Sequence, residues 1–121
     1  MDQSTTIISE LESYLLNCLA EELAEQLQEV CKMRRFGVQN RCPVSGKTNL
    51  EKFYNETVDA EGIKWLLARI GCPMPQNARD PVGMAAKILR TISYARHSVN
   101  AGVLSEEACE LLEEVSRATP N

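Results

Sequence analysis

The chain has 121 residues, a formal net charge of −4, and 44% hydrophobic and 25% charged residues. This length suffices for one core without staples, so we expect a single helical domain over residues 1–121, and the short apolar runs exclude a membrane span. The five cysteines are an odd number and the chain opens without a secretion signal, so we expect a cytoplasmic protein with free thiols.

A long first helix is predicted near residues 5–33, where apolar side chains recur mostly every three or four positions. Ser4 or Thr5 is expected to cap it. Its acids have no Lys or Arg among them before Lys32. Because most steps are of four residues, the apolar stripe drifts around the helix and would contact two neighbours. We expect one neighbour to be a second copy of the chain, which gives a homodimer.

The charge then reverses in a segment of five cations without an acid, formed by Lys32, Arg34, Arg35, Arg41 and Lys47. Glycine, asparagine and proline in the same segment predict a loop. Its end, Gly46-Lys47-Thr48, is similar to the end of a phosphate-binding P-loop. However, Arg41 stands where that motif needs a glycine, and no strand precedes it. A turn followed by a helix cap is therefore the favoured interpretation.

Two helices are expected after this loop. Thr48 and Glu51 have capping-box spacing, which predicts a short helix. A further helix is predicted over residues 59–70, with apolar residues around most of its circumference. That distribution favours a central packing element anchored by Trp65.

The clearest helix is predicted between Asp80 and Asn100. Asp80 suits the N-cap, Pro81 the first helical position and Gly102 the stop after the helix. One side is apolar and is expected to be buried: Val82, Ala85, Ile88, Leu89, Ile92, Ala95 and Val99. The other side carries a cationic and aromatic stripe: Lys87, Arg90, Tyr94 and His97.

A last helix is predicted over residues 105–117, with Ser105 as its cap and Leu104 and Cys109 as a hydrophobic staple. Its apolar residues are assigned to the inner face and its five glutamates to the outer face. The expected fold class is all-α, a small helical bundle of about five helices ending in an αα-hairpin. The helix between Asp80 and Asn100 would pack against those near residues 5–33, 59–70 and 105–117.

No local motif in the sequence assembles catalytic or metal chemistry. The candidate zinc ligands are Cys31, Cys42, Cys72, Cys109 and His97, but none form the close pairs typical of zinc sites. The single histidine has no nucleophile beside it, so we expect no enzyme, no cofactor and no metal. A helix-turn-helix over residues 93–117 would bring five glutamates against DNA phosphates, which disfavours DNA reading by that helix.

The expected function is therefore a non-enzymatic protein–protein interaction module, an adaptor, inhibitor or immunity-type protein that occupies a partner's surface. The candidate partner-binding residues are Lys32, Arg34, Arg35, Arg41, Lys87, Arg90, Tyr94 and His97. Two alternatives stay open. The protein could be nucleic-acid-associated and bind phosphate through the cationic loop, or it could be an acidic mimic that inhibits a nucleic-acid-binding protein.

Overall fold

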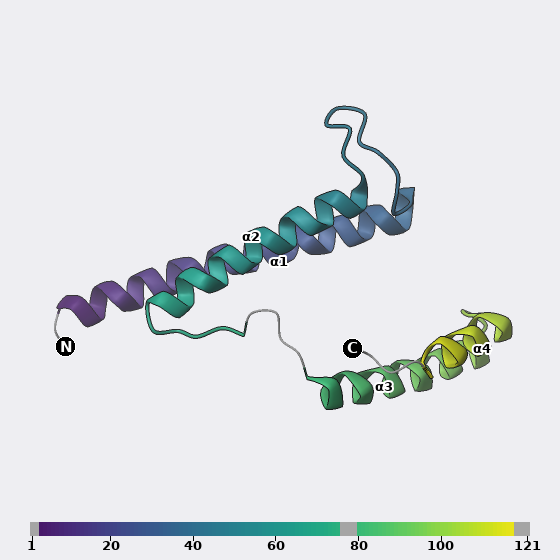
Figure 1. The fold of residues 1–121 in the computed structure, drawn as a ribbon. Coiled ribbons are helices and arrows are strands. Elements are labelled where there is room, and N and C mark those ends of the chain that lie inside the picture. The colour runs from purple at the N-terminus through teal and green to yellow at the C-terminus, as the bar shows by residue number, and fades with distance from the viewer. Residues whose placement is uncertain (1–2, 76–79, 118–121) are drawn as a thin grey trace. The chain divides into compact units, whose positions relative to one another are not determined.

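The computed structural model describes residues 3–75 and 80–117, and within these ranges the protein is all-helical with four helices and no strand. They are α1 (Gln3–Phe36), α2 (Asn49–Arg69), α3 (Pro81–Asn100) and α4 (Glu106–Val115) (Figure 1). The predicted all-α class is confirmed. The chain divides into two compact units, unit 1 (Met1–Asn77) and unit 2 (Ala78–Asn121), and the single domain stays a prediction. No described helix is long and apolar enough to cross a membrane.

Unit 1 is an antiparallel pair formed by α1 and α2, which lie side by side along their length (Figure 1). Its buried apolar core consists of Leu15 and Leu19 from α1 and Ala60 and Leu67 from α2. Residues four or seven positions apart share one face of a helix, so the two helices meet along a narrow seam. Leu67 is fully buried.

The helix α2 replaces the two helices predicted after the loop, so that the described chain has four helices rather than about five. The predicted capping box is confirmed: Thr48 accepts a hydrogen bond from the Glu51 backbone N–H, and the Glu51 carboxylate accepts one from the Thr48 N–H. No proline lies within residues 49–69, so the helix continues through Asp59. Trp65 is 55% exposed, which makes its prediction as a packing anchor wrong.

The helix α1 is longer than predicted at both ends. It begins at Gln3, which places Ser4 inside the helix rather than at its cap, and it continues to Phe36. Gly37, with a φ of +100°, ends it through a bond from its N–H to the Met33 carbonyl. The connection to α2 is therefore residues 37–48. It is held by backbone bonds and by the Asn49 amide, which donates to the Gly37 carbonyl at 2.9 Å.

Unit 2 contains α3 and α4, which contact each other as predicted. The predicted caps are confirmed: the Asp80 carboxylate accepts from the Gly83 N–H at 2.9 Å, and the Ser105 hydroxyl accepts from the Ala108 N–H at 3.1 Å. Gly102, with a φ of +76°, follows the end of α3.

The apolar side of α3 is not buried as predicted. Within the described helix no residue is fully buried, and Val82 and Leu89 are 81% and 68% exposed. The shortness of α4 explains this, because ten residues cover only part of a twenty-residue helix. Leu111 of α4, predicted on the inner face, is also exposed. The packing of α3 against the first helix and against residues 59–70 stays a prediction.

Candidate functional site

The most unusual feature of unit 1 is a group of carboxylates where α1 and α2 meet. Glu22 comes from α1, and Glu56 and Asp59 come from α2. One oxygen from each of these three side chains lies within 4.8 Å of the others. Glu25, one turn after Glu22 on α1, adds a fourth carboxylate to this acidic cluster.

The acidic cluster carries repulsion that no described ion pair relieves. Oε2 of Glu22 and Oε2 of Glu56 are buried and have no hydrogen-bond partner among the described residues. A hydrogen bond to Glu25, followed by burial and by the charges of Glu25 and Glu22, raises the pKa of Glu56 to about 7. Burial, then the charge of Glu25, raises the pKa of Glu22 above 4.5. The cluster therefore resists full ionisation in the absence of a counter-charge.

Two lysines lie on the same side of the helices as the acidic cluster. Lys52 stands four residues before Glu56 on α2, and Lys32 stands seven residues after Glu25 on α1. Both line a pocket of about 270 Å³ at the loop end of unit 1, together with Phe36, Asn40, Cys42, Pro43 and Asn49. Lys32 also pairs with the buried Glu29 at 3.1 Å. One helical turn rises about 5.4 Å, so the lysines are neighbours of the cluster along the pair.

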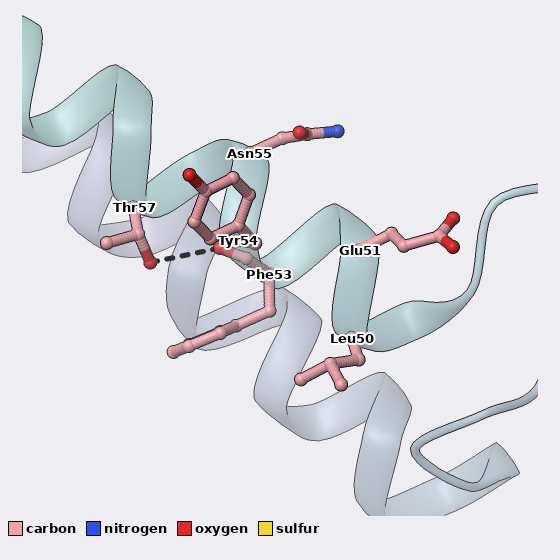
Figure 2. A pocket seen from close by; sticks show the side chains of 6 residues that line it. All are labelled: Leu50, Glu51, Phe53, Tyr54, Asn55 and Thr57. Atoms are coloured by element: carbon pink, nitrogen blue, oxygen red, sulfur yellow. Dashed lines mark hydrogen bonds between the residues drawn. The ribbon is translucent and has the colours of Figure 1, made fainter.

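A second pocket, of about 600 Å³, lies along α2 and is lined mainly by apolar side chains (Figure 2). Leu50, Phe53 and Tyr54 come from its first turns, and the Thr57 hydroxyl bonds back to the Phe53 carbonyl at 3.1 Å. Thr57 also accepts a 2.7 Å hydrogen bond from the Gln26 amide of α1. Most of the surface that this pocket offers is apolar, although Glu51 also lines it.

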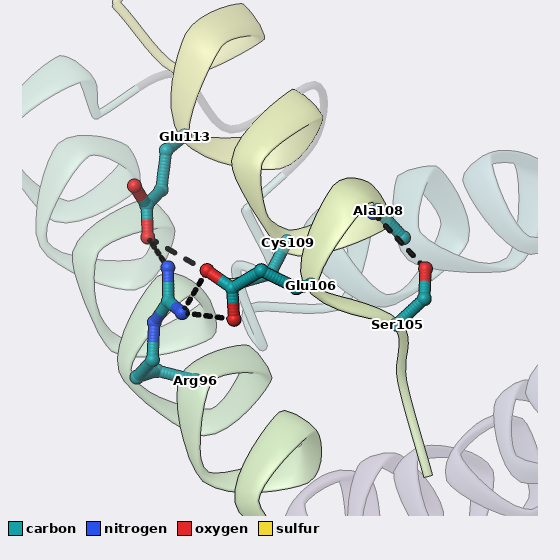
Figure 3. Close-up of polar contacts among 6 residues, drawn as sticks. All are labelled: Arg96, Ser105, Glu106, Ala108, Cys109 and Glu113. Carbon is teal, nitrogen blue, oxygen red and sulfur yellow. Dashed lines mark hydrogen bonds and ion pairs between the residues drawn. The ribbon is translucent and has the colours of Figure 1, made fainter. Parts of the chain in front are cut away.

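In unit 2 two carboxylates of α4, those of Glu106 and Glu113, are paired with a cation. The Arg96 guanidinium of α3 lies between Glu106 and Glu113 of α4, with contacts of 2.6 Å to each (Figure 3). The hydrogen bond from Arg96 holds the pKa of Glu113 below 4.5. Cys109 is fully buried beside this pair, and burial raises the pKa of its thiol. Arg96 therefore connects α3 to α4 through two ion pairs.

The predicted cationic loop is in part helix. Lys32, Arg34 and Arg35 lie in the last turns of α1, because the helix runs to Phe36. Arg34 and Arg35 are exposed, and the Arg35 guanidinium lies 5.7 Å from the centre of the Phe36 ring. Arg41 is in the loop and donates to the Gly46 carbonyl at 2.8 Å, which stabilises the turn.

The predicted stripe on α3 is present, since Lys87, Arg90, Tyr94 and His97 are all exposed on one helix. The residues of this stripe lie in unit 2, whereas the cations of α1 and the loop lie in unit 1.

The candidate zinc ligands are not gathered among the described residues, where the three-residue carboxylate group is the one arrangement suited to a metal ion. All five cysteines are free. A hydrogen bond from the Ser45 backbone, followed by one from the Ser45 side chain, lowers the pKa of the Cys42 thiol to about 7.

Sequence reasoning missed the acidic cluster. The available signal was the position of Glu22 and Glu29 on α1, at steps of seven and fourteen from Leu15, which places them on the seam rather than the outer face. Comparison of the chain with protein-family models, with curated proteins and with solved structures finds no match.

Proposed function

We propose that unit 1 binds a divalent cation at the acidic cluster and, through that cation, the phosphate groups of a small ligand. The observation that carries this proposal is the convergence of Glu22, Glu56 and Asp59, with two buried oxygens that lack a partner. Glu22 and Glu56 are half-buried and Asp59 is exposed, but a buried carboxylate oxygen without a partner is costly, and a cation that it coordinates offsets this cost.

The donor set suits a hard cation such as Mg²⁺ or Mn²⁺, because all the ligand atoms are carboxylate oxygens. Mg²⁺ in proteins commonly keeps several waters and is held by one or two carboxylates together with phosphate oxygens of a substrate. Lys32 and Lys52 provide positive charge near the cluster, which supports binding of a phosphate group between the cation and the lysines.

This arrangement supports metal-assisted hydrolysis of a phosphate ester or anhydride as the reaction class. A bound divalent cation would polarise the phosphoryl oxygens and lower the pKa of a bound water. Within the chain, the carboxylates would hold the ion and the lysines would orient the phosphate. Glu25, beside Glu56, is the candidate to accept a proton from water. This proposal differs from the sequence-based prediction of no enzyme, which stays untested.

The test is calorimetric titration of the full chain with Mg²⁺ and Mn²⁺. We expect saturable binding by the wild type and its loss in Glu56→Gln, which keeps the size of the side chain but removes its charge. Glu21→Gln is the matched control, because Glu21 is exposed next to Glu22 but outside the cluster. Absence of binding by the wild type would reject the cation site.

The phosphate part has its own test. Pyrophosphate should bind tightly only when Mg²⁺ is present, and Lys52→Met should weaken pyrophosphate binding while Mg²⁺ binding persists. Release of phosphate or pyrophosphate from a panel of phosphorylated metabolites then tests the reaction class. Equal affinity for pyrophosphate with and without Mg²⁺ would contradict the bridging role of the cation.

We also propose, as a second candidate, a cytoplasmic interaction module that self-associates and occupies the surface of another protein. The observation in its favour is the exposure of Arg34 and Arg35 in unit 1 and of the stripe on α3 in unit 2. In this proposal unit 2 would act as the predicted terminal αα-hairpin. Arg34→Glu with Arg35→Glu should abolish partner capture without changing the helical spectrum. Capture that survives this double reversal would exclude these arginines as the contact.

A further inference from the structure

An apolar stripe runs along α1 next to the seam with α2. It consists of Leu16, Leu23, Leu27 and Val30, all of which are at least 40% exposed. Each directly follows a residue of the seam, since Leu15, Glu22, Gln26 and Glu29 are buried or half-buried. One residue further along an α-helix is a rotation of about 100°. The stripe therefore lies on one flank of the contact with α2.

A matching stripe runs along α2. Leu50, Tyr54 and Val58 each directly follow a buried or half-buried residue, and Trp65 stands two turns beyond Val58. All four are exposed.

The two stripes lie on the same side of unit 1. Both are displaced from the seam in the same rotational sense, because both follow seam residues by one position. The helix α2 runs in the opposite direction to α1, and its seam faces the opposite way. Each of these two differences reverses the side on which the residue after a seam residue lies. Together they leave both stripes on the same side, where they are neighbours. Glu25, Asp59 and Lys52 directly precede seam residues. Unit 1 thus has one mainly apolar side, and Glu25, Asp59 and Lys52 lie on the opposite side.

We propose that the apolar side packs against the same side of a second copy, with the two α1 helices antiparallel and centred on Leu23. This rests on the self-association proposed above and specifies its interface. Two exposed helical stripes on a pair with a four-residue buried core leave more apolar surface than an isolated pair normally tolerates. Packing two such pairs produces a four-helix arrangement with a continuous core.

Charge complementarity identifies the occupant as a second copy. Glu12 and Arg34 lie eleven residues before and eleven residues after Leu23. In a two-fold antiparallel arrangement Glu12 of one protomer therefore lies level with Arg34 of the other, at both ends of the interface. Leu16 and Val30 are likewise equidistant from Leu23 and would face each other. This self-complementary spacing is the property that an isologous interface requires.

The first test is sedimentation equilibrium of the full chain and of Leu27→Glu. We expect the wild type to be a dimer. The dissociation constant of the variant should be larger by about thirtyfold or more, with an unchanged helical spectrum. Tyr14→Glu is the matched control. Tyr14 and Leu27 are exposed to 64% and 63%, but Tyr14 lies on the other flank of α1, so its replacement should leave the dimer intact. Equal weakening by both variants would overturn the assigned face.

The second test fixes the register by charge reversal. Glu12→Arg and Arg34→Glu should each weaken the dimer by about three- to tenfold, and the double variant should return to within about twofold of the wild type. Additive weakening in the double variant would overturn the antiparallel register while leaving self-association standing. A wild type that is monomeric at all concentrations would overturn both. Retention of the dimer in Glu56→Gln would show that dimerisation does not depend on the cation site.

Discussion

The two units place glutamates between helices in opposite ways. In unit 2, Arg96 lies between Glu106 and Glu113, and the pKa of Glu113 is lowered. In unit 1, Glu22 and Glu56 approach other carboxylates, and their pKa values are raised. Glutamates therefore stabilise the helix pair of unit 2 through an ion pair, whereas in unit 1 neighbouring glutamates disfavour each other's ionised form. Only the carboxylates of unit 1 would gain stability from a cation supplied from outside the chain.

The location of the two groups adds to this contrast. The pair in unit 2 is partly exposed and links α3 to α4, where few apolar residues are buried. The acidic cluster stands in unit 1, where Leu67 and its neighbours already hold α1 and α2 together. A unit with its own apolar core can tolerate an unfavourable polar group, and such tolerated groups are common at functional sites.

The largest expected effect comes from the apolar cores. Leu67→Ala should destabilise unit 1 by about 2–5 kcal/mol, because Leu67 is fully buried and its removal leaves a cavity. Ile92→Ala in α3 should cost less than about 2 kcal/mol, since Ile92 is only half-buried. Amide hydrogen exchange resolved by helix measures both. An equal loss of protection in the two variants would mean that α3 is as well packed as α2.

The next effect concerns the ion pair of unit 2. Arg96→Met should reduce hydrogen-exchange protection in α3 and α4, because it leaves Glu113 half-buried without its partner. Lys64→Met is the control, since Lys64 pairs with Glu61 within one helix and joins no two elements. Full protection of α4 in the Arg96 variant would show that the apolar contacts alone hold it.

The pH dependence should differ between the units. The raised pKa of Glu56, about 7, means that unit 1 binds more protons than the unfolded chain between pH 7 and 4.5. The contribution of Glu56 to the stability of unit 1 is therefore fully present below about pH 4.5 and is lost as the pH rises through 7. Glu113 has a lowered pKa, so its contribution to unit 2 is present above pH 4.5 and is lost as the pH falls further.

Hydrogen exchange at pH 7 and pH 5, corrected for the intrinsic rates, measures this difference. We expect α1 and α2 to become better protected at pH 5 relative to pH 7, and Glu56→Gln to remove most of that gain. Saturating Mg²⁺ should also remove the gain in protection between pH 7 and pH 5, because it would stabilise unit 1 at pH 7. An unchanged pH response in Glu56→Gln would mean that the acidic cluster does not control the stability of unit 1.

Local signals in the sequence predicted three of the four helix caps correctly, and the exception is α1, which begins before the predicted cap at Ser4 or Thr5. The caps at Thr48, Asp80 and Ser105 each depend on one side chain and the next three residues, and all three are confirmed. The continuity of α2 was harder to predict, because Asp59 is compatible with both a helix start and a helix interior. Its surroundings decide between them, since α1 packs along the whole of α2.

Burial and the acidic cluster depended on which helices meet, and the sequence does not contain that information locally. The apolar side of α3 has the regular spacing of a buried face, yet Leu89 is exposed because α4 is short. Glu22 and Glu56 are thirty-four residues apart, and although each has a second acid three residues further on, Glu25 and Asp59, nothing local shows that the two pairs meet. They converge only because the loop of residues 37–48 sets the register in which α2 returns along α1.

The smallest expected effect compares the helix caps of the two units. Thr48→Ala should cost about 1–2 kcal/mol, because Thr48 is buried and both of its capping-box hydrogen bonds involve Glu51. Ser105→Ala should cost about 0.5–1 kcal/mol, because that cap is exposed and consists of one bond, to the Ala108 N–H, which water can replace. Urea unfolding followed by circular dichroism measures both differences. The Thr48 variant has a further consequence, since the backbone of Thr48 pairs with Arg41 across the loop and loss of the side-chain cap bond would leave that end of the loop less firmly held. Loosening the loop would disturb the pocket that contains Lys32 and Lys52, so this variant should weaken pyrophosphate binding, whereas Ser105→Ala should not. Equal effects of the two caps on that binding would contradict the assignment of the phosphate site to unit 1.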